Sequence, residues 1–321
     1  MKNVSELTDF YYKNLFPTLE ELEIQRKNLR YRIIIVGIIY TFIFMLILSG
    51  IPTASQGSGD FFAFALFAYI GLGGVLYKFL TKDYTDEFKI KVIKPLISAI
   101  DEKLNYSSSM HVPQKTFERS ELFTATVDRL SGNDHVKGYI DGTKLEFSDL
   151  HAQKRHRNSK GKESWSTIFK GLFIVAEFNK NFIGKTVVLP DTAQSTFGDL
   201  IGGWLQSKNM GRNELVKMDD NEFEKEFVVY STNQIEARYI LSHSLMQRLL
   251  TFAKKSKHPV YISFIGDSIH MAIYYDKDLF EPSIFHSLLK YKIAMEYVST
   301  LHLAIGIVDE LKLNQKIWSK R

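Results

Sequence analysis

The chain has 321 residues, of which 45% are hydrophobic, and it carries a formal net charge of +5. That length suits one large or two modest domains, and the composition does not indicate disorder. The segment from Lys154 to Lys162 alone carries five positive charges, which excludes a protein that is basic throughout. The chain contains no cysteine, so disulfides, thiolate metal sites and a cysteine nucleophile are excluded as well.

Two apolar segments near the start of the chain predict a membrane anchor. Residues 33–51, IIIVGIIYTFIFMLILSGI, contain no charge over the length that crosses about 30 Å of hydrocarbon at about 1.5 Å per residue. Residues 61–77, FFAFALFAYIGLGGVLY, form a second such run between Asp60 and Lys78. We therefore predict a transmembrane helical hairpin over residues 32–80, with a pair of buried core helices as the alternative.

The flanks of this hairpin differ in charge from the short turn between the spans. The turn, PTASQGSGD at residues 52–60, carries only the charge of Asp60. Lysine and arginine lie on the outer flanks, namely at Arg26, Lys27, Arg30 and Arg32 before the first span and at Lys78, Lys82, Lys89, Lys91 and Lys94 after the second. The positive-inside rule then places both termini in the cytoplasm.

Small residues recur at every third position of the second span, at Ala65, Ala68, Gly71 and Gly74. Such a ladder allows another helix to approach closely. We expect the first span to be that partner, with a second copy of the chain as the alternative.

An amphipathic helix is predicted to lead out of the second span over residues 81–110. Pro95 is expected to kink or divide it, because proline lacks a backbone donor and clashes with the preceding turn. The apolar residues at helical spacing are Phe88, Val92, Ile93, Leu96, Ile97, Ile100 and Leu104.

From about Glu121, short runs rich in Val, Ile, Phe and Thr alternate with turn residues, which predicts an antiparallel sheet. The predicted strands are 122–130, 135–140, 144–153, 166–178, 186–189, 223–230, 260–265 and 268–275. Asp141-Gly142 is expected to form a hairpin turn, and Gly266-Asp267 joins the last two strands.

Two helices are predicted among these strands. The first runs from Gln234 to about Lys255, because Asn233 and Glu236 form a capping-box pattern at its start. The second runs from Pro282 to about Leu313. The predicted fold class is α+β, in which the transmembrane hairpin precedes a cytoplasmic, mainly antiparallel sheet packed with amphipathic helices. The predicted domains are 1–31 (cytoplasmic segment), 32–80 (transmembrane hairpin), 81–110 (connecting helix) and 111–321 (cytoplasmic α+β domain).

The sequence IGKT at Ile183–Thr186 resembles the end of a phosphate-binding P-loop, but the match is poor. Asn179 stands where the motif needs glycine, and Val187 and Val188 favour a strand where the motif needs a helix. We expect a turn between two strands instead.

The remaining titratable candidates indicate no chemistry at motif spacing. His151 and His156 are five residues apart, a spacing that could sit across a bent loop, although exposed histidines are the simpler interpretation. The acidic pairs Asp219-Asp220 and Asp309-Glu310 are interpreted as solvated turn and helix-surface residues. We therefore assign no catalytic, cofactor-binding or metal-binding residue, and no cofactor.

Several stretches resemble an uncharacterised bacterial two-span membrane-protein family, domain of unknown function family 3137, sometimes labelled galanin. The resemblance runs from about Phe79 to the C-terminus and implies a two-span anchor, but no ligand or activity. It is carried by EFSDLHAQ (146–153), FKGLFIVAEFNKNFIGKTVVLPD (169–191), FEKEFVVYSTNQIEARYILS (223–242) and IVDELKLNQKIW (307–318).

The basic stretch is predicted to be a long hairpin loop between a strand that ends near Gln153 and one that begins near Ser166. No aromatic residue lies between Lys154 and Ser164, which argues against nucleic acid because bases need a stacking platform. On the cytoplasmic side of a membrane, anionic headgroups attract each nearby lysine or arginine by about 1 kcal/mol. The expected contacts with such a surface are Lys154, Arg155, Arg157, Lys160 and Lys162, and a merely solvated loop is the alternative.

These features predict a multi-pass protein of the bacterial cytoplasmic membrane that acts as a non-enzymatic binding or scaffold module. Its expected partners are the membrane itself, anionic lipid headgroups or another protein. The alternative is a membrane-bound, hydrolase-like enzyme that acts on a lipid or envelope precursor.

Overall fold

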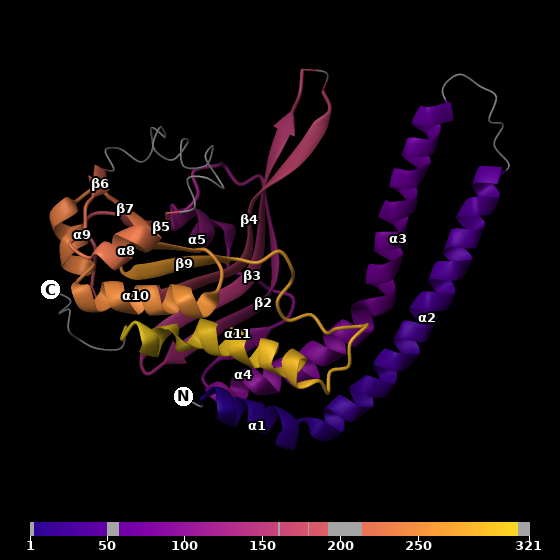
Figure 1. Cartoon of the computed structure of the whole chain (residues 1–321), viewed down its shortest axis with the longest axis horizontal. Coiled ribbons are helices and arrows are strands. Elements are labelled where there is room, and N and C mark those ends of the chain that lie inside the picture. The colour runs from indigo at the N-terminus through magenta and orange to yellow at the C-terminus, as the bar shows by residue number, and fades with distance from the viewer. Residues whose placement is uncertain (1–2, 50–57, 160, 179, 192–213, 314–321) are drawn as a thin grey trace. The chain divides into compact units, whose positions relative to one another are not determined.

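The computed structural model describes residues 3–49, 58–159, 161–178, 180–191 and 214–313 (Figure 1). The chain divides into two compact units. The helical unit consists of Ser5–Leu96 and Glu281–Glu296, and the sheet unit consists of Met1–Val4, Ile97–Phe280 and Tyr297–Arg321. Most of the predicted turn at residues 52–60 lies outside the described residues.

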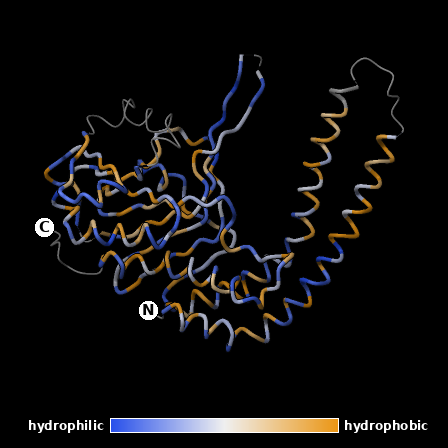
Figure 2. Tube along the Cα trace, viewed as in Figure 1, coloured by the Kyte–Doolittle hydropathy of each residue, from blue (hydrophilic) through white to orange (hydrophobic). Residues whose placement is uncertain are grey.

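The helical unit is built on two long apolar helices. Its helical elements are α1 (Val4–Asn14), α2 (Phe16–Ser49), α3 (Ser58–Phe88), the π-helix η1 (Lys89–Ile93) and the start of α4 (Lys94–Ile100), which continues into the sheet unit from Ile97. In Figure 2 apolar residues, in orange, predominate in the upper parts of the long helices α2 and α3. A core helix would bury such residues, whereas the most apolar 18-residue window of each long helix is 0% buried. Two helices that are long and apolar enough to cross a membrane are thus present, as predicted.

The helix predicted over residues 81–110 is divided close to Pro95, as predicted, but it ends at Ile100, and Asn105–Ser107 is a strand instead. Helix α3 ends at Phe88, five residues of π-helix follow, and Pro95 is the second residue of α4. Because proline offers no N–H and its ring crowds the preceding turn, a widened turn before it relieves the mismatch.

A buried ion pair lies in the polar part of α2. Arg26 donates to both carboxylate oxygens of Glu23, at 2.9 and 2.7 Å, and both side chains are less than 10% exposed. The Arg26 Nη1 group also donates to the carbonyl oxygen of Ile284, at 2.6 Å. The backbone N–H of Leu288 donates to Glu23 Oε2 at 3.3 Å. Each guanidinium nitrogen of Arg26 and both carboxylate oxygens of Glu23 thus have a hydrogen-bond partner. The segment Glu281–Glu296 is therefore an integral part of the helical unit.

The sheet unit contains a nine-stranded sheet whose pairs are all antiparallel, in the order β1-β2-β3-β4-β9-β8-β5-β7-β6. Its strands are β1 (Asn105–Ser107), β2 (Arg129–Ile140), β3 (Thr143–Arg157), β4 (Glu163–Glu177), β5 (Thr186–Pro190), β6 (Glu214–Val216), β7 (Phe227–Ser231), β8 (Val260–Ile265) and β9 (Ser268–Tyr274). Its other helices are α5 (Gln114–Arg119), α8 (Asn221–Glu226), α9 (Gln234–Ile240), α10 (His243–Ser256) and α11 (Tyr291–Glu310), the last of which begins in the helical unit. The α+β class is confirmed.

Aromatic side chains form much of the core on the face of the sheet that α5 covers. Phe117 of α5 packs against Phe169 and Phe173 of β4, at ring-centroid distances of 5.9 and 5.1 Å. Tyr261 and Tyr274 extend this cluster across β8 and β9. Phe169 and Phe173 are both fully buried and belong to the core.

The turn at Asp141-Gly142 is also confirmed. Both residues have positive φ, 47° for Asp141 and 81° for Gly142. A two-residue hairpin turn that matches strand twist requires this left-handed conformation, which aspartate and glycine adopt most readily. It sets the register between β2 and β3, in which Ile140 pairs with Thr143.

Two predicted strands are wrong at their starts. The predicted strand 122–130 begins only at Arg129, because Leu122 and Val127 are both buried in the aromatic core and lie outside any ladder. The predicted strand 223–230 begins at Phe227, because Asp220 accepts hydrogen bonds from the N–H groups of Glu222 and Phe223 and starts the short helix α8.

Both predicted helices of the sheet region were too long. The first is divided into α9 and α10, since Ser242 accepts from the N–H of Leu245 and caps a new helix. Asn233 does cap α9, accepting from the N–H of Glu236 at 3.0 Å. The second begins at Tyr291 and not at Pro282, because Ile284 and Leu288 turn their backbone groups toward the buried ion pair of α2.

Candidate functional site

The basic stretch forms the end of the β3–β4 hairpin, and the predicted long loop is wrong. The two strands stay paired out to Arg157 and Glu163, with His156 opposite Ser164 and Lys154 opposite Ser166. In Figure 1 this end of the hairpin projects beyond the rest of the sheet. We call residues 154–166 the ribbon.

The tip of the ribbon is closed by hydrogen bonds of Asn158. Its N–H donates to the carbonyl oxygen of Lys162, at 3.0 Å, and its carbonyl accepts from the N–H of Gly161, at 2.9 Å. The Asn158 side-chain oxygen accepts from the N–H of Lys162 at 2.9 Å. Of the five predicted contact residues, Lys160 lies outside the part of the chain that the structure describes.

Alternation along the strands divides the cations between two faces. The first, the arginine face, carries Arg155 opposite Trp165 and Arg157 opposite Glu163. Arg129 at the start of β2 joins this face, since its guanidinium carbon lies 4.0 Å from the centre of a Trp165 ring. The arginine face is defined as Arg129, Arg155, Arg157, Glu163 and Trp165.

The second face of the ribbon, the lysine face, is the more polar one. Lys154 and His156 lie on it, opposite two serines, and His156 Nε2 lies 2.7 Å from the hydroxyl of Ser166. The same alternation places Lys162, which pairs with Asn158, on this side. The predicted contact residues that the structure describes therefore lie on two faces of the ribbon and not on one. The lysine face is defined as Lys154, His156, Lys162, Ser164 and Ser166.

The arginine face includes two residues that the sequence did not single out, Arg129 and Trp165. Trp165 is 37% exposed and Arg155 has 53% of its side chain exposed. The ion pair between Arg155 and Glu163 is 3.4 Å long and open to solvent, so it holds Arg155 only weakly. A carboxylate oxygen of Asp128 accepts from the N–H of Arg155 at 2.8 Å, which fastens the base of the ribbon.

The two histidines near the ribbon do not come together. His151 and His156 lie on opposite faces of β3, where His151 Nε2 contacts the Thr167 hydroxyl at 3.0 Å. Burial and the nearby Lys170 lower the pKa of His151. The structure thus gives the pair separate hydroxyl partners.

The acidic pairs have structural contacts. Asp220 is buried, contrary to the expectation of a solvated residue, because it caps α8 and accepts from Gln247 Nε2 at 2.7 Å. Glu310 forms an ion pair of 2.7 Å with Lys255. These contacts explain both carboxylates without a catalytic role.

The IGKT turn binds a carboxylate of the protein itself. The N–H groups of Ile183 and Gly184 donate to the two carboxylate oxygens of Glu236, at 3.1 and 2.6 Å. A Cβ atom at Gly184 would lie 2.8 Å from Asn233 Cβ, so only glycine fits there. The strand β5 begins immediately afterwards, as predicted, and these amides already have an anionic partner.

Asp149 on β3 is a buried carboxyl group that no sequence pattern had indicated. It is 4% exposed and accepts from the backbone N–H of Leu279 at 3.0 Å. Burial raises its pKa to about 7, and the neighbouring carboxylates of Asp278 and Asp134 act in the same direction. The group is therefore protonated in part at neutral pH.

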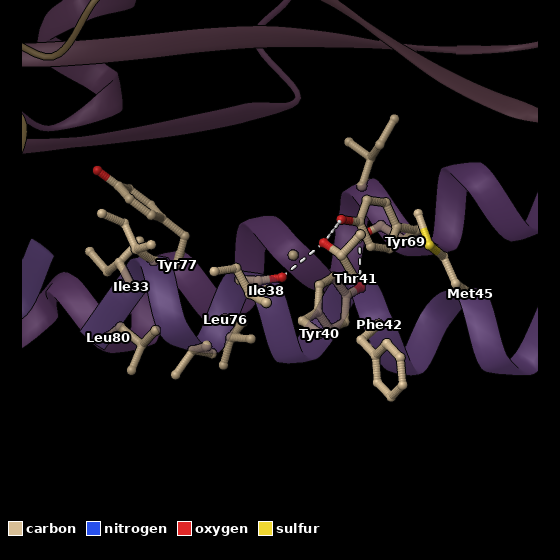
Figure 3. Close-up of a pocket in the computed structure, with 15 residues that line it drawn as sticks. Ile33, Ile38, Tyr40, Thr41, Phe42, Met45, Tyr69, Leu76, Tyr77 and Leu80 are labelled. Atoms are coloured by element: carbon tan, nitrogen blue, oxygen red, sulfur yellow. Dashed lines mark hydrogen bonds between the residues drawn. The ribbon is translucent and has the colours of Figure 1, made fainter. Parts of the chain in front are cut away.

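An apolar groove of about 690 Å³ lies between α2 and α3 (Figure 3). Its polar contacts are internal, because the Tyr40 hydroxyl donates to the carbonyl oxygen of Tyr69 at 2.8 Å and the Tyr69 hydroxyl lies 2.7 Å from Thr41 Oγ1. The rings of Tyr40 and Tyr69 are stacked, with centroids 4.8 Å apart.

The two glycines of the small-residue ladder do not form this helix contact. A Cβ atom at Gly73 would lie 3.4 Å from the Tyr40 ring, whereas Cβ atoms at Gly71 and Gly74 would meet nothing within 4 Å. The expectation that Gly71 and Gly74 face the first span is therefore wrong. The helical repeat of 3.6 residues carries a strict three-residue ladder gradually around the helix.

Residues 167–313 match the family model described as Protein of unknown function (DUF3137). Over these residues the chain belongs to the DUF3137 family. The predicted membership is thereby confirmed. The DUF3137 match covers less than half of the chain and begins just after the ribbon.

The other comparisons add a distant likeness. Among solved structures, the chain is similar to the crystal structure of the mycobacterial trehalose monomycolate transport factor A, TtfA. The likeness covers 66% of this chain and 91% of that chain, at 12% sequence identity and a TM-score of 0.29. No curated protein matches the chain by sequence.

Proposed function

We propose that this DUF3137 protein is a non-enzymatic, membrane-anchored binding module that contacts anionic lipid headgroups through its ribbon. The observation that carries the proposal is the ribbon itself, a two-stranded extension with exposed cations on both faces. It occurs in a chain that also has two exposed apolar helices. A module held at a bilayer meets headgroups at high effective concentration, so modest attraction suffices for binding.

The proposed location is the cytoplasmic membrane of a bacterium, with α2 and α3 as the spans and both termini in the cytoplasm. The lysines and arginines on the outer flanks of the two helices support this orientation. The proposed domains keep the boundaries 1–31, 32–80, 81–110 and 111–321.

Electrostatics sets the scale of the proposed contact. Each lysine or arginine near an anionic surface contributes about 1 kcal/mol, and the attraction falls off over a Debye length of about 10 Å at 0.1 M salt. The proposed contacts are Lys154, Arg155, Arg157, Lys160 and Lys162. Together they support binding that is strong at low salt and weak at high salt.

A flotation assay with the full chain held in a non-ionic amphipol tests the proposal. We expect the protein to float with vesicles that contain phosphatidylglycerol and not with pure phosphatidylcholine vesicles, and to be released by salt. The variant with all five contacts changed to Gln should lose most of this binding. Wild-type protein that floats equally with both vesicle types, or with neither, would contradict the proposal.

A further inference from the structure

We infer that the arginine face is the side of the ribbon that lies against the anionic bilayer, with Trp165 among the headgroups and the arginines on lipid phosphates. This inference rests on the proposed function and adds an orientation to it. The lysine face then points to water.

Charge alone does not select a face. Arg129, Arg155 and Arg157 less Glu163 give the arginine face a formal charge of about +2, and Lys154 with Lys162 gives the lysine face the same value. The two faces therefore differ in the kind of side chain and not in the amount of charge. If charge alone drove binding, both faces of the ribbon would contact the bilayer equally.

The indole is the first difference. Trp165 is the only Trp, Tyr or Phe between Lys154 and Ser166, and it is 37% exposed although it lies under Arg129. Tryptophan prefers the membrane–water interface, where its apolar ring and its N–H group both find suitable surroundings. The lysine face offers serine hydroxyls and His156 at the corresponding positions.

The guanidinium groups are the second difference. A planar guanidinium binds the oxygens of a phosphate in pairs, and it sheds water more easily than a lysine ammonium group does. Arg155 and Arg157 are exposed, and the partner of Arg155, Glu163, is itself 44% exposed and bound only loosely. Lipid phosphates can therefore compete for both arginines. The stacking of Arg129 on Trp165 presents a third cation over the face of the ring.

A lipid surface fits this face better than nucleic acid does. Binding of single strands uses several aromatic rings on which successive bases stack, and the ribbon has one. A single tryptophan flanked by arginines is instead the composition of an interfacial contact. The apolar helices α2 and α3 supply the second membrane attachment that one small contact needs.

Two matched double variants test the orientation in the flotation assay. R155Q/R157Q removes two charges from the arginine face, and K154Q/K162Q removes two from the lysine face. We expect the arginine variant to bind phosphatidylglycerol vesicles at least tenfold more weakly, because two contacts of about 1 kcal/mol each are lost. The lysine variant should weaken binding by no more than about threefold, through long-range attraction alone.

Fluorescence of Trp165 gives an independent readout. In the W204F/W318F background Trp165 is the only tryptophan of the full chain. With the protein in nanodiscs, we expect headgroup-level nitroxide lipids to quench Trp165 in anionic bilayers, either in the disc or in added vesicles, and R155Q/R157Q to abolish the quenching. Circular dichroism establishes that each variant retains its sheet.

The outcomes separate the two proposals. Anionic binding with equal losses in both double variants and an unquenched Trp165 would overturn the orientation and leave the proposed function standing. Absence of anionic binding by wild-type protein would overturn both. Binding to duplex DNA that is tighter than binding to the vesicles at the same salt, or displacement of the vesicles by excess glycerol phosphate, would overturn a lipid surface as the occupant.

Discussion

The two units each contain an Arg–Glu ion pair, and the two pairs have opposite surroundings. Arg26 and Glu23 in the helical unit are 2.7 Å apart with 4% and 8% of their side chains exposed. Arg155 and Glu163 on the ribbon are 3.4 Å apart with 53% and 44% exposed. Burial makes the first pair part of the structure, because an unpaired charge left there would be strongly unfavourable. Exposure leaves the second pair available to a ligand.

The largest expected effect comes from breaking the buried pair. Arg26→Met should lower the free energy of unfolding by about 3–5 kcal/mol, since it leaves the Glu23 carboxylate buried without its cation. The matched change Arg155→Met on the ribbon should cost less than about 1 kcal/mol. Denaturant unfolding of the full chain in detergent, followed by circular dichroism, measures both. Similar losses for the two variants would contradict the comparison.

Asp149 extends the comparison, because burial outweighs the nearby Lys170 in setting the pKa of this carboxyl group. Its pKa of about 7 in the folded protein lies above the ordinary value of 3.8, so the folded state binds more protons between those pH values. Stability from this group is therefore present at low pH and is lost as the pH rises toward 7. Asp149→Asn keeps an acceptor for the Leu279 N–H and should stabilise the protein by up to about 4 kcal/mol at pH 8.

The control for Asp149→Asn is the same measurement at pH 4. There the wild-type carboxyl group is protonated in the folded state, so the variant and the wild type should be equally stable. A stabilisation that is independent of pH would show that the carboxyl group is not the source of the effect.

A capping carboxylate ranks next. Asp220→Ala removes the acceptor for the first N–H groups of α8 and for Gln247, and should cost about 1–2 kcal/mol. The exposed neighbour Asp219 provides the matched control, and Asp219→Ala should change stability by less than about 0.5 kcal/mol. Thermal unfolding distinguishes them, and equal shifts would argue against the cap.

The smallest expected effect concerns the exposed pair again. Glu163→Gln removes the only acid of the arginine face and should leave stability within about 0.5 kcal/mol of wild type. It should raise the affinity of the protein for phosphatidylglycerol vesicles about three- to fivefold. The anionic headgroups no longer repel a Glu163 carboxylate, and Arg155 loses its ion-pair partner. Flotation titrations measure this gain, and an unchanged affinity would indicate that Glu163 lies away from the bilayer.

Sequence patterns predicted the features that depend on long apolar runs and on local turn chemistry. Hydropathy alone located α2 and α3, and Asp141-Gly142 specified its turn because few other residues adopt that conformation. The capping residue Asn233 was recognised for the same local reason.

The missed features depend on partners that are distant in the chain. Residues 154–157 lack apolar alternation, so the extension of β3 into the ribbon followed from pairing with β4 and not from its own pattern. Trp165 meets Arg129 only because three strands share one register. Asp149 owes its raised pKa to burial, and its hydrogen-bond donor, the N–H of Leu279, is 130 residues away in sequence.

The segment Glu281–Glu296 has a consequence for synthesis of the protein. The helices α1 to α3 leave the ribosome before the sheet, but the backbone partners of Arg26 and Glu23, at Ile284 and Leu288, follow more than 250 residues after the ion pair. Until then the ion pair has neither its carbonyl acceptor nor its amide donor from that segment. The helical unit is thus completed only after the described strands of the sheet have been made.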